Sequence, residues 1–152
     1  MSKVSLALVI HSHQPVGNFD HVIEDAYQKC YAPFVRALHS YPRIRLSLHF
    51  SGILLEWLEH HHPEYFQQLR ELVGRGQVEM VGGGYYEPIL PIIPDADKIA
   101  QLRKLADYLK HHFGRAPAGA WRPPISPALP PLIGPGHRAS RIWITMAASI
   151  FS

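Results

Sequence analysis

The chain has 152 residues, of which 47% are apolar and 18% charged, and this is enough apolar sequence for one globular domain with a core. Its apolar runs are far shorter than the roughly 20 residues of a membrane span, the N-terminus has no secretory leader pattern, and the one cysteine excludes an internal disulfide. We therefore expect a soluble, cytoplasmic protein with no membrane partner.

The net charge of +3 is unevenly distributed along the chain. Residues 1–107 hold 10 basic and 12 acidic side chains, whereas residues 108–152 hold 5 basic and no acidic ones. Seven of the 14 prolines fall between Pro117 and Pro135. Because the sequence contains no Lys/Arg cluster with interleaved aromatic residues, we expect no nucleic-acid partner.

The first 50 residues predict a strand, a helix and a second strand. Val4–Ile10 is a nearly continuous apolar run, typical of a parallel strand buried on both faces. Apolar residues then recur at three- and four-residue steps over residues 20–40, which predicts a helix kinked or divided at Pro33. Apolar and polar residues alternate over residues 44–50, as in a strand.

The middle of the chain continues this alternation of helices and strands. Residues 53–74 predict two helices separated by Pro63, and residues 78–81 predict a short third strand. Asp95–Phe113 has helical spacing, with Asp95 expected as the N-cap and Gly114 as the stop.

Ala118–Trp121 is expected to begin a fourth strand. The βαβαβαβ order predicts an α/β fold with a parallel sheet or barrel. Beyond Trp121 the pattern fails, because proline clusters stand where a strand and helix should continue. We expect an irregular tail over residues 122–152, although its apolar end, 142–152, could also form a strand.

Two histidines stand at the end of the first predicted strand. His11 and His13 are spaced by two, so both rings should point to one face at a carboxyl edge, where ligands bind in parallel α/β proteins. They could ligate a metal, hydrogen-bond the hydroxyls of a substrate, or be structural. Gln14 and Pro15 follow directly and favour a substrate loop. The histidine tract at residues 60–62 is interpreted as solvated surface.

Two glutamates lie near the third predicted strand. Glu79 alternates with apolar neighbours and should point into a barrel interior or site, where a sugar hydroxyl, a histidine such as His13, or water would pair with it. Glu87 follows three glycines and Tyr85-Tyr86. Aromatic rings beside a carboxylate suit carbohydrate recognition, although these tyrosines could equally be packing. The glycines predict a tight turn or a close approach of a ligand.

Three segments together resemble the amino-terminal part of glycoside hydrolase family 57: HSHQP at 11–15, SLHFSG at 47–52 and GRGQVEMVGGGYYEPILP at 74–91. The resemblance covers residues 4–121. It implies a retaining α-glucan-active enzyme, such as an α-amylase or 4-α-glucanotransferase, on an incomplete (β/α)7 barrel of which about four βα units are present. It also implies that His13 and Glu79 line the donor sugar site, with no metal or other cofactor.

Retaining chemistry needs two carboxyl groups about 5–5.5 Å apart. The resemblance places the nucleophile three residues after Trp121, at position 124, which is Pro124. It places the acid/base aspartate beyond Ser152. We therefore expect a catalytically inactive fragment, and we attribute the tail from Arg122 to a reading-frame shift or sequencing error.

The expected sugar site comprises His11, His13, Gln14, Glu79, Tyr86, Glu87 and Trp121, and its expected ligand is an α-glucan or maltooligosaccharide. Two alternatives stay open. One is a metal-dependent hydrolase, similar to a polysaccharide deacetylase, in which His11 and His13 bind zinc or manganese. The other is a non-catalytic glucan-binding remnant that uses Tyr85, Tyr86 and Trp121.

Overall fold

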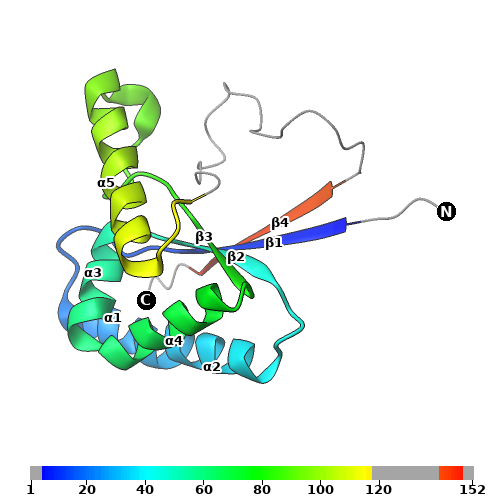
Figure 1. Cartoon of the computed structure of the whole chain (residues 1–152). Helices are drawn as coiled ribbons and strands as arrows, with labels where there is room; N and C mark the ends of the chain where they lie inside the picture. Colours follow the sequence, from blue (N-terminus) through cyan, green and yellow to red (C-terminus); the bar gives the residue numbers. More distant parts are fainter. Residues whose placement is uncertain (1–4, 118–140, 149–152) are drawn as a thin grey trace.

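The computed structural model describes residues 5–117 and 141–148, and the side chains of residues 7–117. Parallel strands form one sheet in the order β3-β2-β1-β4 (Figure 1). The strands are β1 (Ser5–Ser12), β2 (Leu46–Phe50), β3 (Val78–Val81) and β4 (Arg141–Ala148). In the described part of the chain, no helix is long and apolar enough to cross a membrane.

The three predicted amino-terminal strands are confirmed with small shifts of their ends. β1 runs two residues past Ile10 and therefore includes His11, and β2 begins at Leu46. β3 has the predicted bounds. The extension of β1 matters because it places His11 within the sheet, directly opposite a residue of β2.

The register of the sheet separates a packed face from a polar one. Ile10, Leu48 and Met80 occupy one row across β1, β2 and β3, and all three are buried in the main core. The next row holds His11 and His49, whose side chains point to the opposite face because side chains alternate along a strand. The helices α1, α2 and α4 gather on one side of the strands (Figure 1).

The first helical region contains a wide turn just before Pro33. It comprises α1 (Asp20–Ala26), the π-helical segment η1 (Tyr27–Tyr31) and α2 (Ala32–Ser40), and the amide of Ala32 bonds to the carbonyl of Tyr27, five residues earlier. Proline has no N–H to donate and its ring pushes aside the carbonyl four residues before it, so the helix widens there. The predicted irregularity is confirmed, one turn ahead of the proline.

The remaining helices are α3 (Gly52–His61), α4 (Pro63–Gly74), η2 (Leu90–Ile92) and α5 (Asp95–Phe113). Gly114 ends α5 with a φ of 72°, as predicted. The predicted N-cap is wrong by one residue, since Pro94 occupies that position without a side-chain cap. Asp95 is instead the first helical residue, and its carboxylate accepts from Lys98 Nζ at 2.7 Å.

The expectation of an irregular tail is wrong for residues 141–148, where the structure has a strand, the alternative left open for the apolar end of the tail. These residues form β4, which pairs with β1 in parallel from Ser5↔Arg141 to Ser12↔Ala148. The β-branched and aromatic residues at 142–145 explain this strand by their preference for extended backbone. The fourth strand predicted at residues 118–121 lies outside the described residues.

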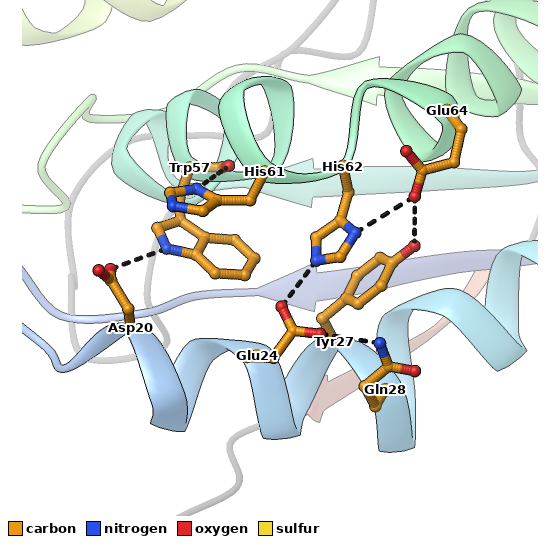
Figure 2. Close-up of polar contacts among 8 residues, drawn as sticks. All are labelled: Asp20, Glu24, Tyr27, Gln28, Trp57, His61, His62 and Glu64. Atoms are coloured by element: carbon orange, nitrogen blue, oxygen red, sulfur yellow. Dashed lines mark hydrogen bonds and ion pairs between the residues drawn. The ribbon is translucent and has the colours of Figure 1, made fainter.

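A polar junction joins the first helix to the α3–α4 corner (Figure 2). His62 Nε2 lies 2.7 Å from Glu24 Oε2, and its Nδ1 lies 3.2 Å from Glu64 Oε1. The ring of His62 stacks on Tyr27 with centroids 3.5 Å apart. The interpretation of this tract as solvated surface is wrong for His62, whose side chain is 14% exposed because it fills the space between the two helices.

Trp57 anchors the other end of the same junction. Its indole N–H donates to Asp20 Oδ1 at 3.0 Å, and the exposed His61 stacks on its ring (Figure 2). The expectation that Trp57 is a core residue is confirmed, since it is buried with the main apolar cluster. His60 is exposed and contacts the backbone carbonyl of Glu56 on its own helix.

Candidate functional site

Three imidazole rings stack at the carboxyl ends of β1 and β2. His11 and His49 are partners in the register, and His13 follows β1 directly. The centroids of His11 and His13 are 6.1 Å apart with an 11° angle between the rings, and those of His11 and His49 are 4.9 Å apart at 18°. The prediction that His11 and His13 share one face is confirmed.

The carboxylate of Glu87 faces all three rings. Glu87 Oε2 lies 2.9 Å from His13 Nδ1 and 3.5 Å from His11 Nε2, while Oε1 lies 3.4 Å from His49 Nδ1. These are close polar contacts between a carboxylate and three imidazole nitrogens. The sequence supplied both His11 and His13 but not their convergence on this carboxylate, which depends on the path of the loop after β3.

Sequence reasoning missed His49 as a member of this group. A signal was present, because Ser47 and His49 alternate with the buried Leu46, Leu48 and Phe50 and must therefore share the polar face. The parallel register then sets His49 beside His11, with Nδ1 atoms 2.8 Å apart. His49 is completely buried, with 0% of its side chain exposed.

The loop after β3 brings Glu87 to the histidines through tight backbone geometry. Glu87 has a φ of 50°, a left-handed conformation that is costly for a residue with a side chain, and its amide donates to the carbonyl of Gly84 at 3.1 Å. A Cβ on Gly83 would lie 2.5 Å from His49 Nε2, and one on Gly84 would lie 2.8 Å from Pro88. The close neighbours of these glycines are therefore protein groups.

Burial keeps the inner histidines neutral. Burial, together with the neighbouring His11 and His13, lowers the pKa of His49 to about 3. Burial also lowers the pKa of His11, against the opposing charge of Glu87. Near neutral pH both rings are therefore uncharged, and each carries a single N–H.

Gln14 shapes the loop that follows β1. Its amide nitrogen donates to the hydroxyl of Tyr31 at 3.0 Å, and its amide oxygen accepts from Asn18 at 2.8 Å. The residue is 5% exposed. Both ends of the amide thus serve protein groups and hold the segment that carries His13.

The two tyrosines before Glu87 lie in different environments. Tyr85 is 1% exposed and packs so closely on Gly52 that a Cβ there would clash with its ring. Tyr86 is 40% exposed, and its hydroxyl accepts from Lys104 Nζ at 2.6 Å. Tyr85 is thus a packing residue, whereas Tyr86 is accessible beside α5.

Glu79 points to the same face as the histidines but lies two rows closer to the amino ends of the strands. It is opposite Ser47 and exposed, and it lines surface depressions of about 380 and 310 Å³, one bordered by Phe113 and Arg115. The carboxylate that contacts His13 is that of Glu87 and not Glu79. Trp121 and Pro124 lie outside the described residues.

The cluster offers polar groups suited to a hydroxyl-rich ligand. His13 is the most exposed histidine of the three, with 31% of its side chain accessible. A neutral imidazole can accept or donate a hydrogen bond to a hydroxyl, and its face can pack on an apolar ligand surface. The ligand atoms of His11, His49 and Glu87 lie within 4.8 Å of one another, so a cation could also use them.

Comparisons with known proteins show which family this chain is similar to. Residues 7–126 match the model of glycosyl hydrolase family 57. The chain is 52% identical over 119 residues to alpha-amylase 1 of Dictyoglomus thermophilum and 43% identical over 121 residues to the 4-alpha-glucanotransferase of Thermococcus litoralis. These alignments cover 78% and 80% of this chain but only 17% and 18% of the two relatives.

Solved structures agree with the sequence matches. The crystal structure of the 4-alpha-glucanotransferase from Thermococcus litoralis superimposes with a TM-score of 0.74 and 44% identity, over 76% of this chain and 18% of that one. A branching enzyme from Thermococcus kodakaraensis superimposes with a TM-score of 0.64 at 16% identity, over 76% of this chain and 32% of that one, which indicates a shared fold.

Proposed function

The chain belongs to glycosyl hydrolase family 57, and on that premise we propose that it is the amino-terminal part of an α-glucan-active catalytic domain and forms one wall of its sugar site. The named relatives, an alpha-amylase and a 4-alpha-glucanotransferase, support an α-glucan or maltooligosaccharide as the ligand. The chain spans less than a fifth of the length of each.

We propose further that the sheet is a portion of a (β/α)7 barrel. The parallel order β3-β2-β1-β4 and the superposition on a family member support this arrangement. In such a barrel the inner face of the strands carries the site at their carboxyl ends. His11, His13 and His49 occupy that position, on the face opposite the apolar core.

The observation that carries the proposal is the group formed by Glu87 and the three histidines. It gathers polar side chains from two strands and a loop at one edge, and it leaves His13 accessible. Glu79 and Tyr86 are accessible on the surrounding surface. Hydrogen bonds from such groups to sugar hydroxyls would orient a glucose unit.

The proposed activity of the 152-residue chain is binding without cleavage. A retaining glycosidase needs a nucleophilic carboxylate, and the position expected for it holds Pro124, which has no group that can attack. The family match ends at residue 126, which supports the proposal that the tail near Arg122 departs from the family. Cytoplasmic location stays a prediction from the sequence.

The comparisons lend no support to the two alternatives. The two relatives at 52% and 43% identity are named as an alpha-amylase and a 4-alpha-glucanotransferase, and neither name points to a metal-dependent hydrolase built on His11 and His13. The second alternative differs from our proposal in the residues that contact the sugar, and geometry disfavours its use of Tyr85, which is 1% exposed and packs against Gly52.

Calorimetric titration of the full chain with maltoheptaose tests the proposal. We expect saturable binding with a Kd on the order of millimolar, since half a site offers few contacts. His13→Ala should remove most of the heat of binding. His60→Ala alters an exposed histidine at the carboxyl end of α3, and this variant should bind as the wild type does. Binding that is equal for cellohexaose, or unchanged in His13→Ala, would contradict the proposed site.

A further inference from the structure

A chain of polar contacts leads from His13 into the sheet. His13 Nδ1 lies 2.9 Å from Glu87 Oε2, His11 Nε2 lies 3.5 Å from the same oxygen, and the Nδ1 atoms of His11 and His49 are 2.8 Å apart. The exposed fractions of the histidine side chains fall from 31% for His13 to 14% for His11 and 0% for His49. His13 is therefore the accessible end of the chain.

The charge of Glu87 determines which ring nitrogens carry protons. A carboxylate only accepts, so it attracts an N–H at these distances and repels a lone pair. Of the two neutral tautomers of His13, the carboxylate therefore favours the one with its proton on Nδ1, in which Nε2 has none. By the same reasoning, His11 carries its proton on Nε2, the nitrogen that faces the carboxylate.

His49 completes this assignment without conflict. Because His11 Nδ1 has no proton, it must accept from the Nδ1–H of His49 across their 2.8 Å contact. That same N–H faces Glu87 Oε1 at 3.4 Å, which is again favourable. The buried His49 is neutral and has one N–H. His11 Nδ1 and Glu87 Oε1 both favour that proton on Nδ1 of His49.

We propose that Glu87 and His49 are positioning residues that fix the tautomers of His11 and His13, so that His13 offers an unprotonated Nε2 to a hydroxyl of the bound sugar. The inference rests on the proposed function, because the hydroxyl is that of an α-glucan. It gives His11 a supporting role within the cluster, since both of its ring nitrogens face protein groups.

The local backbone favours this role for Glu87. Its φ of 50° is one that a glycine would adopt more easily, and such strained residues concentrate at functional sites. Gly83 leaves the space that the ring of His49 needs, since a Cβ there would lie 2.5 Å from Nε2. The loop after β3 thus carries Glu87 and leaves room for the ring of His49 on β2.

A cation is the competing occupant of the same group. The ligand atoms of His11, His49 and Glu87 lie within 4.8 Å of one another. A metal ion would take a lone pair from each ring and could not share His49 Nδ1 with a proton. A bound metal ion and the proposed set of hydrogen bonds therefore predict different protonation states for His49 Nδ1, and one NMR spectrum distinguishes them.

Long-range proton–nitrogen NMR of the full chain, labelled with ¹⁵N-histidine, tests the assignment. We expect the Nδ1–H tautomer for His13 and His49 and the Nε2–H tautomer for His11 at neutral pH. In Glu87→Gln the preference of His13 should be lost, because an amide can donate as well as accept. The signals of His60 in the same spectrum serve as an internal control for the fold.

Two variants separate the role of His49 from simple packing. In His49→Asn the amide nitrogen takes the place of Nδ1–H, so His11 should keep its tautomer. In His49→Leu no donor remains at that position, so His11 should lose its preference for that tautomer. Glu87→Gln and His49→Leu should also weaken maltotriose binding about fivefold, the effect of one ordinary hydrogen bond, and His49→Asn should restore it.

The outcomes separate this inference from the proposed function. The expected tautomers together with the fivefold loss support the inference. An Nε2–H tautomer for His13, or stoichiometric Zn²⁺ binding that shifts His11 and His49, would overturn it even if maltotriose binds. The expected tautomers without any maltotriose binding by the wild type would overturn the proposed function and the sugar-facing role of His13 with it.

Discussion

At Gly83 the backbone passes so close to a buried ring that no side chain fits. Gly83→Ala would place a Cβ 2.5 Å from His49 Nε2, and the ring of His49 cannot move away because it is completely buried. We expect a loss of about 1–3 kcal/mol in the free energy of unfolding, the usual cost of overpacking. Urea denaturation followed by circular dichroism measures it.

Gly74 provides the matched control for this substitution. It ends α4, and a Cβ there would meet nothing within 4 Å. Gly74→Ala should be neutral or stabilise the chain by up to about 1 kcal/mol, since alanine favours helix. Equal effects at the two glycines would show that the close contact at His49 does not exist.

The neutral state of His49 makes the stability depend on pH. The folded pKa is lowered to about 3, so between the ordinary value of 6.5 and about 3 the unfolded chain binds a proton that the folded chain does not. The free energy of unfolding should therefore fall as pH falls through this window, by at most about 1.4 kcal/mol per pH unit from this group.

Urea unfolding at several pH values between 7.5 and 4.5 measures this dependence. His49→Asn removes the titrating ring, so its stability should fall less steeply than that of the wild type. His60→Asn, at an exposed position, should keep the slope of the wild type. Parallel slopes for the wild type and His49→Asn would contradict the neutral, buried ring.

For single residues, the sequence predicted which side chains belong to the site more readily than it predicted which side chains they contact. The spacing of His11 and His13 was sufficient to place both rings on one face, because alternation along a strand is geometric. The contact between His13 and Glu87 was not predictable, since it depends on a left-handed residue that is not glycine. Glu79, for which His13 was one of the candidate partners, is held two rows away from the histidines by the register.

Between elements, His62 holds α1 against the α3–α4 corner (Figure 2). His62→Ala removes two carboxylate contacts and the stacking on Tyr27, and we expect a loss of about 1–2 kcal/mol. Thermal unfolding measures the change. His60→Ala should stay within about 0.5 kcal/mol of the wild type because His60 contacts only its own helix.

The same junction should weaken in acid. The hydrogen bonds from Gln28 and His62 lower the pKa of Glu24, and the pKa of Glu64 is lowered by a backbone N–H and then by His62. Both carboxylates stabilise the fold above the ordinary glutamate value of 4.5 and cease to do so as pH falls below it. The loss caused by His62→Ala should accordingly shrink at pH 3.5; a constant loss would contradict the contacts.

Most elements could be predicted because periodicity and stop signals are local. The helix ending at Gly114 and the irregularity near Pro33 follow from the properties of those two residues. β4 could not be predicted firmly, because the proline-rich sequence before it gives no sign of which edge of the sheet the strand joins. Its pairing with β1 is a long-range contact that only the fold reveals.

Over the whole molecule, the described strands leave an edge open. β3 ends the order β3-β2-β1-β4, so in the described part of the chain its outer side carries no strand. Open parallel edges promote association between chains. We expect the isolated chain to self-associate in sedimentation experiments. Val81→Lys, which adds a charge at the end of this edge, should raise the monomer fraction; a fully monomeric wild type would contradict the open edge.

The central claim is that these strands hold an α-glucan without cleaving it. The most direct measurement is a proton NMR time course of the full chain with maltoheptaose. We predict that the ring signals of His13 shift saturably while the anomeric signals of the sugar stay unchanged over a day. New reducing ends, transfer products, or histidine signals that do not move would contradict the account.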